Sequence, residues 1–263
     1  MNIGIIGEGA IGRFVRDHLR ERGHEVRALL LRPERLQDRA TEAGGPLCVA
    51  TVADLPNDID HMIDCAGHGA LRSFGPDILR GGTDLTTVSI GALADPDLYG
   101  SLEQAAHAGH ARLHLASGAI GALDCLRAAR VGTLQSVTYT GRKPPRGWQG
   151  SLAEERLDLD NLVDGPAVHF DGTARDAATG YPKNANVAAA VALAGLGFDE
   201  TRVQLIADPD IDANVHEIHA SGEFGSFSFE IRGRALPDNP RSSALAAMSI
   251  VGKLEQESQG IVF

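Results

Sequence analysis

Cysteine, positive charge and long apolar runs are all scarce in this chain. The three cysteines among 263 residues, Cys48, Cys65 and Cys125, form neither a disulfide framework nor a zinc pattern, which favours a reducing compartment. A net charge of -11 argues against nucleic acid or an anionic membrane as the main partner. No apolar run approaches the roughly 20 residues that span a bilayer, and no basic leader with a cleavage site is visible. We therefore expect a cytoplasmic protein.

What the chain does have is a regular alternation of strands and helices over residues 1–117. Apolar runs separated by amphipathic or helix-forming segments indicate parallel strands joined by helical crossovers. This rhythm predicts a Rossmann-type, doubly wound α/β domain that binds a dinucleotide. The expected strands are 2–6, 25–31, 61–65, 84–89 and 112–116, with a short one at 47–50. The expected helices are 10–22 and 95–108, with a weaker one over 33–43.

The pattern changes after residue 117. A helix is expected to begin near Ala119, residues 151–180 are acidic and loop-like, and "YPKNANVAAAVALAGLG" predicts a helix with a proline start and a glycine stop. Alternating segments such as "LQSVTYTGRK" and "NVHEIHASGEFGSFSFEIRG" predict strands. We expect a second, α+β domain with a mixed sheet over 118–240, serving catalysis, substrate binding and dimerisation. A final helix within 241–263 is expected to pack back on the first domain.

Three glycines follow the first strand at the spacing of a dinucleotide loop. In "GEGAIG", Gly7 permits the tight turn, Gly9 lets a pyrophosphate approach the backbone, and Gly12 lets helix and strand pack closely. Ala10 and Ile11 begin the helix, where free N–H groups face an anion. The alternative is a glycine-rich turn without a ligand, but the strand before it and the helix after it favour a bound dinucleotide.

The end of the second strand bears on which dinucleotide is used. An NAD site commonly carries an acidic residue about 20 residues after the glycine loop, to hold the ribose hydroxyls. The sequence here is "VRALLLRPERL", with Arg32 at that point and Arg35 nearby. A guanidinium suits a 2′-phosphate, so we expect both NAD and NADP to work, with a preference for NADP; the alternative is two solvated arginines at a helix start.

Small residues follow the strand that ends near Cys65. Ala66, Gly67 and His68 are expected at the carboxyl end of the sheet, beside the nicotinamide half of the cofactor. His68 is a candidate catalytic group, although an exposed loop histidine is the simpler interpretation. His107, His110 and His114 point in scattered directions across a helix end and a strand, so no metal site is predicted.

Chemistry-bearing residues gather in two stretches of the second domain. Lys183, Asn184 and Asn186 are expected in the first turn of the alanine-rich helix, where they face an anion, although plain capping by Asn184 is the alternative. Strand alternation places His216 and His219 on opposite faces, so one of them points to the cleft, where a histidine that titrates near neutrality would carry a proton. Arg142 and Lys143 at a strand end are candidates for holding substrate carboxylates. The alternative is that they form a solvated basic strand end.

These motifs resemble the L-aspartate dehydrogenase family over most of the chain. The specific match is the pair "YPKNANVAAA" and "ADPDIDANVHEI", supported by "DCAGHGAL", "LASGAIGALD" and "TGRKPP". The resemblance implies a homodimer that oxidises L-aspartate to iminosuccinate with NAD or NADP and supplies NAD biosynthesis. It also implies that His216 is the active-site histidine and that Asn186 and Ala119 contact the cofactor. Arg32 departs from the acid of an NAD-strict enzyme.

The expected mechanism assigns His216 to proton transfer from the substrate amine or to activation of water. Two substrate carboxylates need cationic or N–H partners, for which Arg142, Lys143 and Lys183 are the candidates, with Lys183 also placed among the catalytic residues. One rival is another two-domain reductase of the homoserine dehydrogenase or dihydrodipicolinate reductase type. A second is a non-catalytic dinucleotide-binding regulator.

Overall fold

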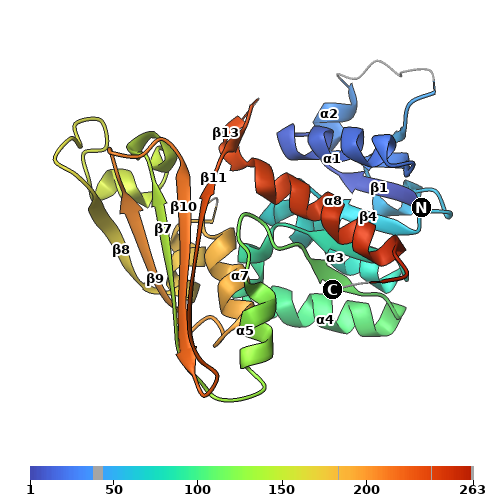
Figure 1. Ribbon diagram of the computed structural model, residues 1–263. Coiled ribbons are helices and arrows are strands. Elements are labelled where there is room, and N and C mark those ends of the chain that lie inside the picture. Colours follow the sequence, from blue (N-terminus) through green and yellow to red (C-terminus); the bar gives the residue numbers. More distant parts are fainter. Residues whose placement is uncertain (38–43, 183, 238, 262–263) are drawn as a thin grey trace. The chain divides into compact units, whose positions relative to one another are not determined.

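The computed structural model describes residues 1–263 except 38–43, 183, 238 and 262–263 (Figure 1). It separates into two compact units. The first comprises residues 1–116 together with 247–263, and the second comprises residues 117–246. Each unit has its own sheet, and the two are described in turn.

The first unit is built on a six-stranded sheet with the order β3-β2-β1-β4-β5-β6, in which every neighbouring pair is parallel. The predicted Rossmann-type sheet is therefore confirmed. Its strands are β1 (Asn2–Ile6), β2 (Glu25–Leu30), β3 (Leu47–Val49), β4 (His61–Asp64), β5 (Asp84–Thr87) and β6 (Leu113–Leu115). The chain moves outward from β1 in both directions, which creates the switch point where dinucleotides bind in such sheets.

Helices pack against this sheet. They are α1 (Ala10–Glu21), α2 (Pro33–Gln37), α3 (His68–Arg80), α4 (Pro96–Gly109) and α8 (Ala244–Ser258), with short 3₁₀ turns η1 (Val52–Asp54) and η2 (Ile90–Ala94). Right-handed crossovers in opposite directions place α1 and α3 on opposite faces of the sheet. The helix predicted for 33–43 is described only as far as Gln37, and its remainder falls outside the described residues.

The end of α8 belongs to the core of the first unit. Ile250 and Leu254 are fully buried in a cluster that also contains Ile3 and Val15. A polar contact also joins the sheet to this helix, because His114 Nδ1 on β6 lies 2.9 Å from Glu257 Oε1 on α8. Residues more than 200 positions away in sequence thus complete the hydrophobic face of the first strand.

The second unit is a five-stranded mixed sheet with the order β11-β10-β7-β9-β8, in which only the β7–β9 pair is parallel. This confirms the predicted α+β character. Its principal strands are β7 (Leu134–Lys143), β8 (Ala167–Thr173), β9 (Arg202–Ala207), β10 (Asn214–Gly222) and β11 (Gly225–Gly233). Other elements are α5 (Leu123–Ala129), α6 (Ala174–Gly180), α7 (Asn186–Ala194), η3 (Pro145–Trp148), η4 (Leu152–Glu155) and the small hairpin of β12 (Ala235–Leu236) and β13 (Asn239–Ser243).

Three local predictions in this unit were wrong. The helix expected near Ala119 begins only at Leu123, after left-handed backbone at Gly118 and Ala122. Residues 151–180, expected to be a loop, contain β8 and α6. Their apolar periodicity is weak because β8 is an edge strand with exposed positions, so tertiary pairing overrides local composition.

The helix expected from Pro182 also begins later, at Asn186. Asn184 therefore precedes the helix rather than lying in its first turn, and Ala185 occupies the position before it without a side-chain capping bond. Lys183 lies outside the described residues.

Candidate active site

The glycine loop takes the conformation that its spacing predicts. Gly7 has φ +85°, which disfavours any side chain, and a Cβ there would lie 2.7 Å from the Ala66 Cβ. A Cβ on Gly12 would lie 2.4 Å from the Gly7 carbonyl oxygen, so this glycine permits the close packing of α1 on the loop. Both glycines are explained by the fold of the protein itself.

Gly9 is different, because nothing in the protein requires a glycine there. Its φ of -72° is open to any residue, and an added Cβ would meet no atom of the described residues within 4 Å. Ala10 and Ile11 follow it in the first turn of α1, where backbone N–H groups have no partner within the helix. The open space over Gly9 at a helix N-terminus fits the pyrophosphate of a dinucleotide.

A hollow of about 750 Å³ lies over this loop, within the size range of ligand pockets. It brings together the ends of β1 and β2 with the start of α3. Sequence-predicted residues that line it are Gly7, Gly9, Arg32 and Ala66, and Arg35 lines it as well. Gly67 and His68 come directly after Ala66, where α3 begins. The hollow therefore joins a glycine loop, the three guanidinium groups of Arg13, Arg32 and Arg35, and a small-residue wall, which suits an adenosine diphosphate moiety.

Asp64 organises the wall of this hollow, and sequence reasoning missed it. The side chain is fully buried and accepts hydrogen bonds from Ala66 N at 2.9 Å, Thr87 Oγ1 at 2.8 Å and Ser89 Oγ at 2.5 Å. Burial raises the pKa of this carboxyl, and the hydrogen bonds oppose that rise. Asp64 thereby ties the loop after β4 to the loop after β5, and it holds Ala66 in place.

In the second unit, the two histidines of β10 lie on opposite faces, as the alternation predicts. His216 is 3% exposed, whereas the side chain of His219 is 56% exposed. His216 Nδ1 lies 2.7 Å from the hydroxyl of Tyr139 on β7, and both side chains are buried. Burial and the nearby Lys143 ammonium lower the pKa of His216 to about 3. The expectation of a histidine that titrates near neutrality is therefore corrected for the free protein.

Lys143 shares the buried face of β7 with Tyr139. Its ammonium donates a hydrogen bond to Asn184 Oδ1 at 2.8 Å and lies 4.9 Å from the ring centre of Trp148. Burial lowers the pKa of Lys143 to about 8, so the group still carries its proton near neutral pH. The structure thus brings together two predicted substrate contacts, Lys143 and Asn184, although they are 41 residues apart in sequence.

Arg142 points to the other face of β7. Its guanidinium donates to Asp208 Oδ2 at 3.2 Å and lies 3.9 Å from Glu217 Oε1. Adjacent strand residues cannot face the same side, so Arg142 and Lys143 are separated by the pleat. Among the other predicted residues, Ala119 is buried in the segment before α5, and Asn186 is the first residue of α7.

Both units match known families. Residues 4–116 match the NAD-binding domain model of homoserine dehydrogenase, and residues 124–257 match the C-terminal domain model of aspartate dehydrogenase. The L-aspartate dehydrogenase of Ruegeria pomeroyi is 54% identical over 99% of this chain and 94% of that protein. This chain belongs to the L-aspartate dehydrogenase family.

Other members of the L-aspartate dehydrogenase family agree with this placement. The Pseudomonas aeruginosa enzyme of that name is 44% identical, with 99% of each chain covered. The crystal structure of aspartate dehydrogenase from Thermotoga maritima has a TM-score of 0.79 and 26% identity, and the match covers 100% of this chain and 99% of that one. The predicted resemblance is therefore confirmed over the full length.

The pairing of Tyr139 with His216 in this family member was also missed by sequence reasoning. "LQSVTYTGRK" shows Tyr139 on the buried face of its strand, and a buried phenol needs a polar partner. The signal was therefore present, but the partner depends on which strand lies beside β7. The same applies to the contact between Trp148 and Lys143.

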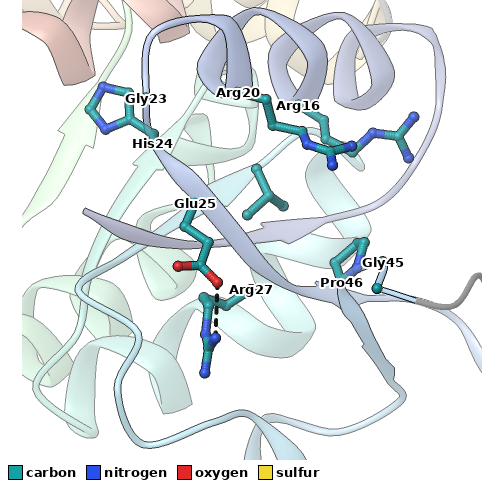
Figure 2. Close-up of a pocket in the computed structure, with 10 residues that line it drawn as sticks. Arg16, Arg20, Gly23, His24, Glu25, Arg27, Gly45 and Pro46 are labelled. Atoms are coloured by element: carbon teal, nitrogen blue, oxygen red, sulfur yellow. Dashed lines mark hydrogen bonds and ion pairs between the residues drawn. The ribbon is translucent and has the colours of Figure 1, made fainter.

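A second hollow in the L-aspartate dehydrogenase fold lies at the amino end of β2 (Figure 2). Two of its arginines already have acidic partners, since Arg16 pairs with Glu8 and Asp17, and Arg27 pairs with Glu25 and Asp58. The dashed line in Figure 2 marks the pair within the hollow, between Arg27 and Glu25. Ligands of doubly wound sheets bind at the opposite, carboxyl ends of the strands. We assign no site to this hollow.

Proposed function

We propose that this protein is an NAD(P)-dependent dehydrogenase that oxidises L-aspartate to iminosuccinate. Iminosuccinate hydrolyses to oxaloacetate and ammonia, or it supplies NAD biosynthesis. The observation that carries the proposal is the buried imidazole of His216, held by Tyr139 in a unit that matches the aspartate dehydrogenase C-terminal domain. The cradle over Gly9 supplies the binding place for the dinucleotide.

The chemistry requires a proton and a hydride to leave the substrate. The substrate ammonium must first lose a proton, and His216 accepts it because the imidazole is neutral in the free protein. The redox chemistry, removal of a hydride from the α-carbon, would be supplied by the nicotinamide of a dinucleotide held by the loop around Gly9. A bound dicarboxylate would offset the charge of Lys143, which is the second cause of the lowered pKa of His216 after burial, and would therefore raise that pKa above its value in the free protein.

The two substrate carboxylates need partners. Lys143 is the best-supported candidate, because its protonated ammonium lies on the buried face of β7 next to Asn184. Lys183 remains a candidate from the sequence. Arg142 is engaged with Asp208, so its guanidinium serves a carboxylate only if that pair rearranges.

The proposed function is tested by mixing the purified protein with L-aspartate and either NAD or NADP and following absorbance of the reduced nicotinamide. We expect reduction with both cofactors and none with L-homoserine, because the site offers cationic partners for a second carboxylate. A panel of amino and hydroxy acids is the control. Turnover of another substrate in preference to aspartate would overturn the proposal, and binding without turnover of any would favour a regulator.

Arg32 sets the expected preference between the two cofactors. It lines the hollow just beyond β2, where an NAD site of such a sheet commonly carries an acid to hold the ribose hydroxyls. We expect Arg32→Asp to lower kcat/KM for NADP about tenfold or more, equivalent to ~1.4 kcal/mol, while NAD is retained or improved. Steady-state kinetics with both cofactors measure this, and Arg72→Asp on the exposed side of α3 is the charge control. An unchanged NADP preference would remove Arg32 from the site.

We further propose that the protein is a cytoplasmic homodimer. The cytoplasmic location is supported by the sparse cysteines, and the dimer by the family resemblance. Among the described residues, no helix is long and apolar enough to cross a membrane.

A further inference from the structure

We propose that Tyr139 is the positioning residue that holds the imidazole of His216 for proton transfer, and that Gly141 is a glycine because it leaves room for the Tyr139 hydroxyl. This inference rests on the proposed function, since it names the group that orients the proton acceptor. It concerns the second unit alone, where all three residues lie.

The geometry of the pair is specific. The Tyr139 hydroxyl lies 2.7 Å from His216 Nδ1, and the two ring planes differ by only 19° with centroids 6.0 Å apart. Across the β7–β10 pair, however, the residue opposite His216 is Gly141, and the residue opposite Tyr139 is Ile218. The phenol therefore extends along the strand, over Gly141, to meet the imidazole beside it.

Gly141 is the second, independent observation. It lies within an extended strand and has no positive φ, so its backbone does not require glycine. A Cβ at this position would lie 2.7 Å from the Tyr139 hydroxyl oxygen, its nearest neighbour, and 3.2 Å from both Tyr139 Cζ and Leu205 Cδ2. The missing side chain is therefore explained by the path of the phenol to His216.

A phenol suits this role because it both donates and accepts hydrogen bonds. When Nδ1 carries a proton, the hydroxyl accepts it in a hydrogen bond, and when Nδ1 is bare, the hydroxyl donates. The contact therefore survives a change of tautomer or charge on the imidazole, and Nε2 is left as the nitrogen that exchanges a proton with the substrate. Burial raises the pKa of Tyr139, which keeps the phenol protonated throughout.

The first test needs no substrate. Nitrogen-15 NMR of histidine-labelled protein reports the hydrogen bonding of the ring nitrogens of each of the 10 histidines, and His216→Gln assigns the signal of interest. We expect the Nδ1 shift of His216 to be that of a hydrogen-bonded nitrogen in the wild type and to lose this signature in Tyr139→Phe, which keeps the ring but removes the hydroxyl. An unchanged Nδ1 shift in Tyr139→Phe would overturn the proposal. Because the free protein is used, this result stands apart from whether aspartate is the substrate.

The second test is a double-mutant cycle with Gly141→Ala. We expect each single variant to lower kcat about tenfold, because a small displacement of a reacting group is costly, with KM for the dinucleotide unchanged. In the double variant the hydroxyl that the new methyl displaces is absent, so the two effects do not multiply. Effects that multiply would show that the residues act independently and would sink the inference.

Tyr181→Phe is the matched control. Tyr181 is another buried tyrosine of this unit, and its hydroxyl lies 3.0 Å from Nδ1 of a different buried histidine, His169. Its removal costs a comparable hydrogen bond but leaves His216 untouched. We expect a wild-type Nδ1 shift for His216 and kcat within about twofold of wild type, with urea unfolding of every variant reporting its stability. A similar loss of kcat in Tyr181→Phe would assign the Tyr139 effect to general stability.

Discussion

His216→Ala lowers kcat by about a hundredfold or more in the expected result, because a positioned acid or base contributes a factor of this size. The imidazole is buried and engaged through Nδ1 with Tyr139, so no neighbouring side chain on β10 can replace it. Binding of the dinucleotide, measured by fluorescence titration, is expected to stay within about threefold of wild type. Steady-state kinetics with saturating L-aspartate measure the loss.

His219→Ala is the control for this prediction. It lies on the same strand, three residues away, but on the exposed face, where Nδ1 contacts Ser228 Oγ at 2.8 Å. We expect near-normal turnover.

Since the pKa of His216 is lowered to about 3 in the free protein, the imidazole stays neutral from pH 5 upward, and the pH profile of kcat/KM should show no ionisation of His216 near pH 6.5. Normal turnover in His216→Ala would remove this residue from the mechanism.

Gly9→Ala is expected to weaken NAD(P) binding by about tenfold to a hundredfold, or ~1.4–2.8 kcal/mol. Within the part of the chain that the structure describes, the added methyl meets no atom within 4 Å, and it needs no unusual backbone, so it enters the space assigned to the pyrophosphate. Unfolding of the free protein should change by less than about 1 kcal/mol, the scale of a helix N-cap substitution. Isothermal titration calorimetry with each dinucleotide and urea unfolding give the two quantities.

Gly12→Ala separates a structural glycine from a ligand-binding one. Its methyl would lie 2.4 Å from the Gly7 carbonyl oxygen, so we expect a loss of about 1–3 kcal/mol in the free energy of unfolding from overpacking. The two variants should therefore differ in the quantity that they change. Gly9→Ala should lower the affinity for the dinucleotide, and Gly12→Ala should lower the free energy of unfolding. Wild-type affinity in Gly9→Ala would place the pyrophosphate elsewhere.

Much of the site could be predicted from short stretches of sequence. The glycine spacing predicted the dinucleotide loop, and the structure has the tight turn and close packing that this spacing implies. The alternation of the strand predicted that His216 and His219 lie on opposite faces. Predictions failed where local signals compete with packing. The edge strand β8 has no clean alternation. The helix within "YPKNANVAAA" begins only at Asn186, and Asn184 before it accepts a hydrogen bond from Lys143.

The sequence by itself determined the features that repeat over a few residues, namely the parallel-sheet rhythm, the glycine loop and the buried face of each strand. Such patterns follow from the helix and strand periods of about 3.6 and 2 residues, which act within one segment. Only the tertiary structure decided which buried groups meet. Tyr139 and His216 are 77 residues apart, and Asp64 and Ser89 are 25 apart. Their contacts depend on strand order and register, which are set by packing across the whole sheet.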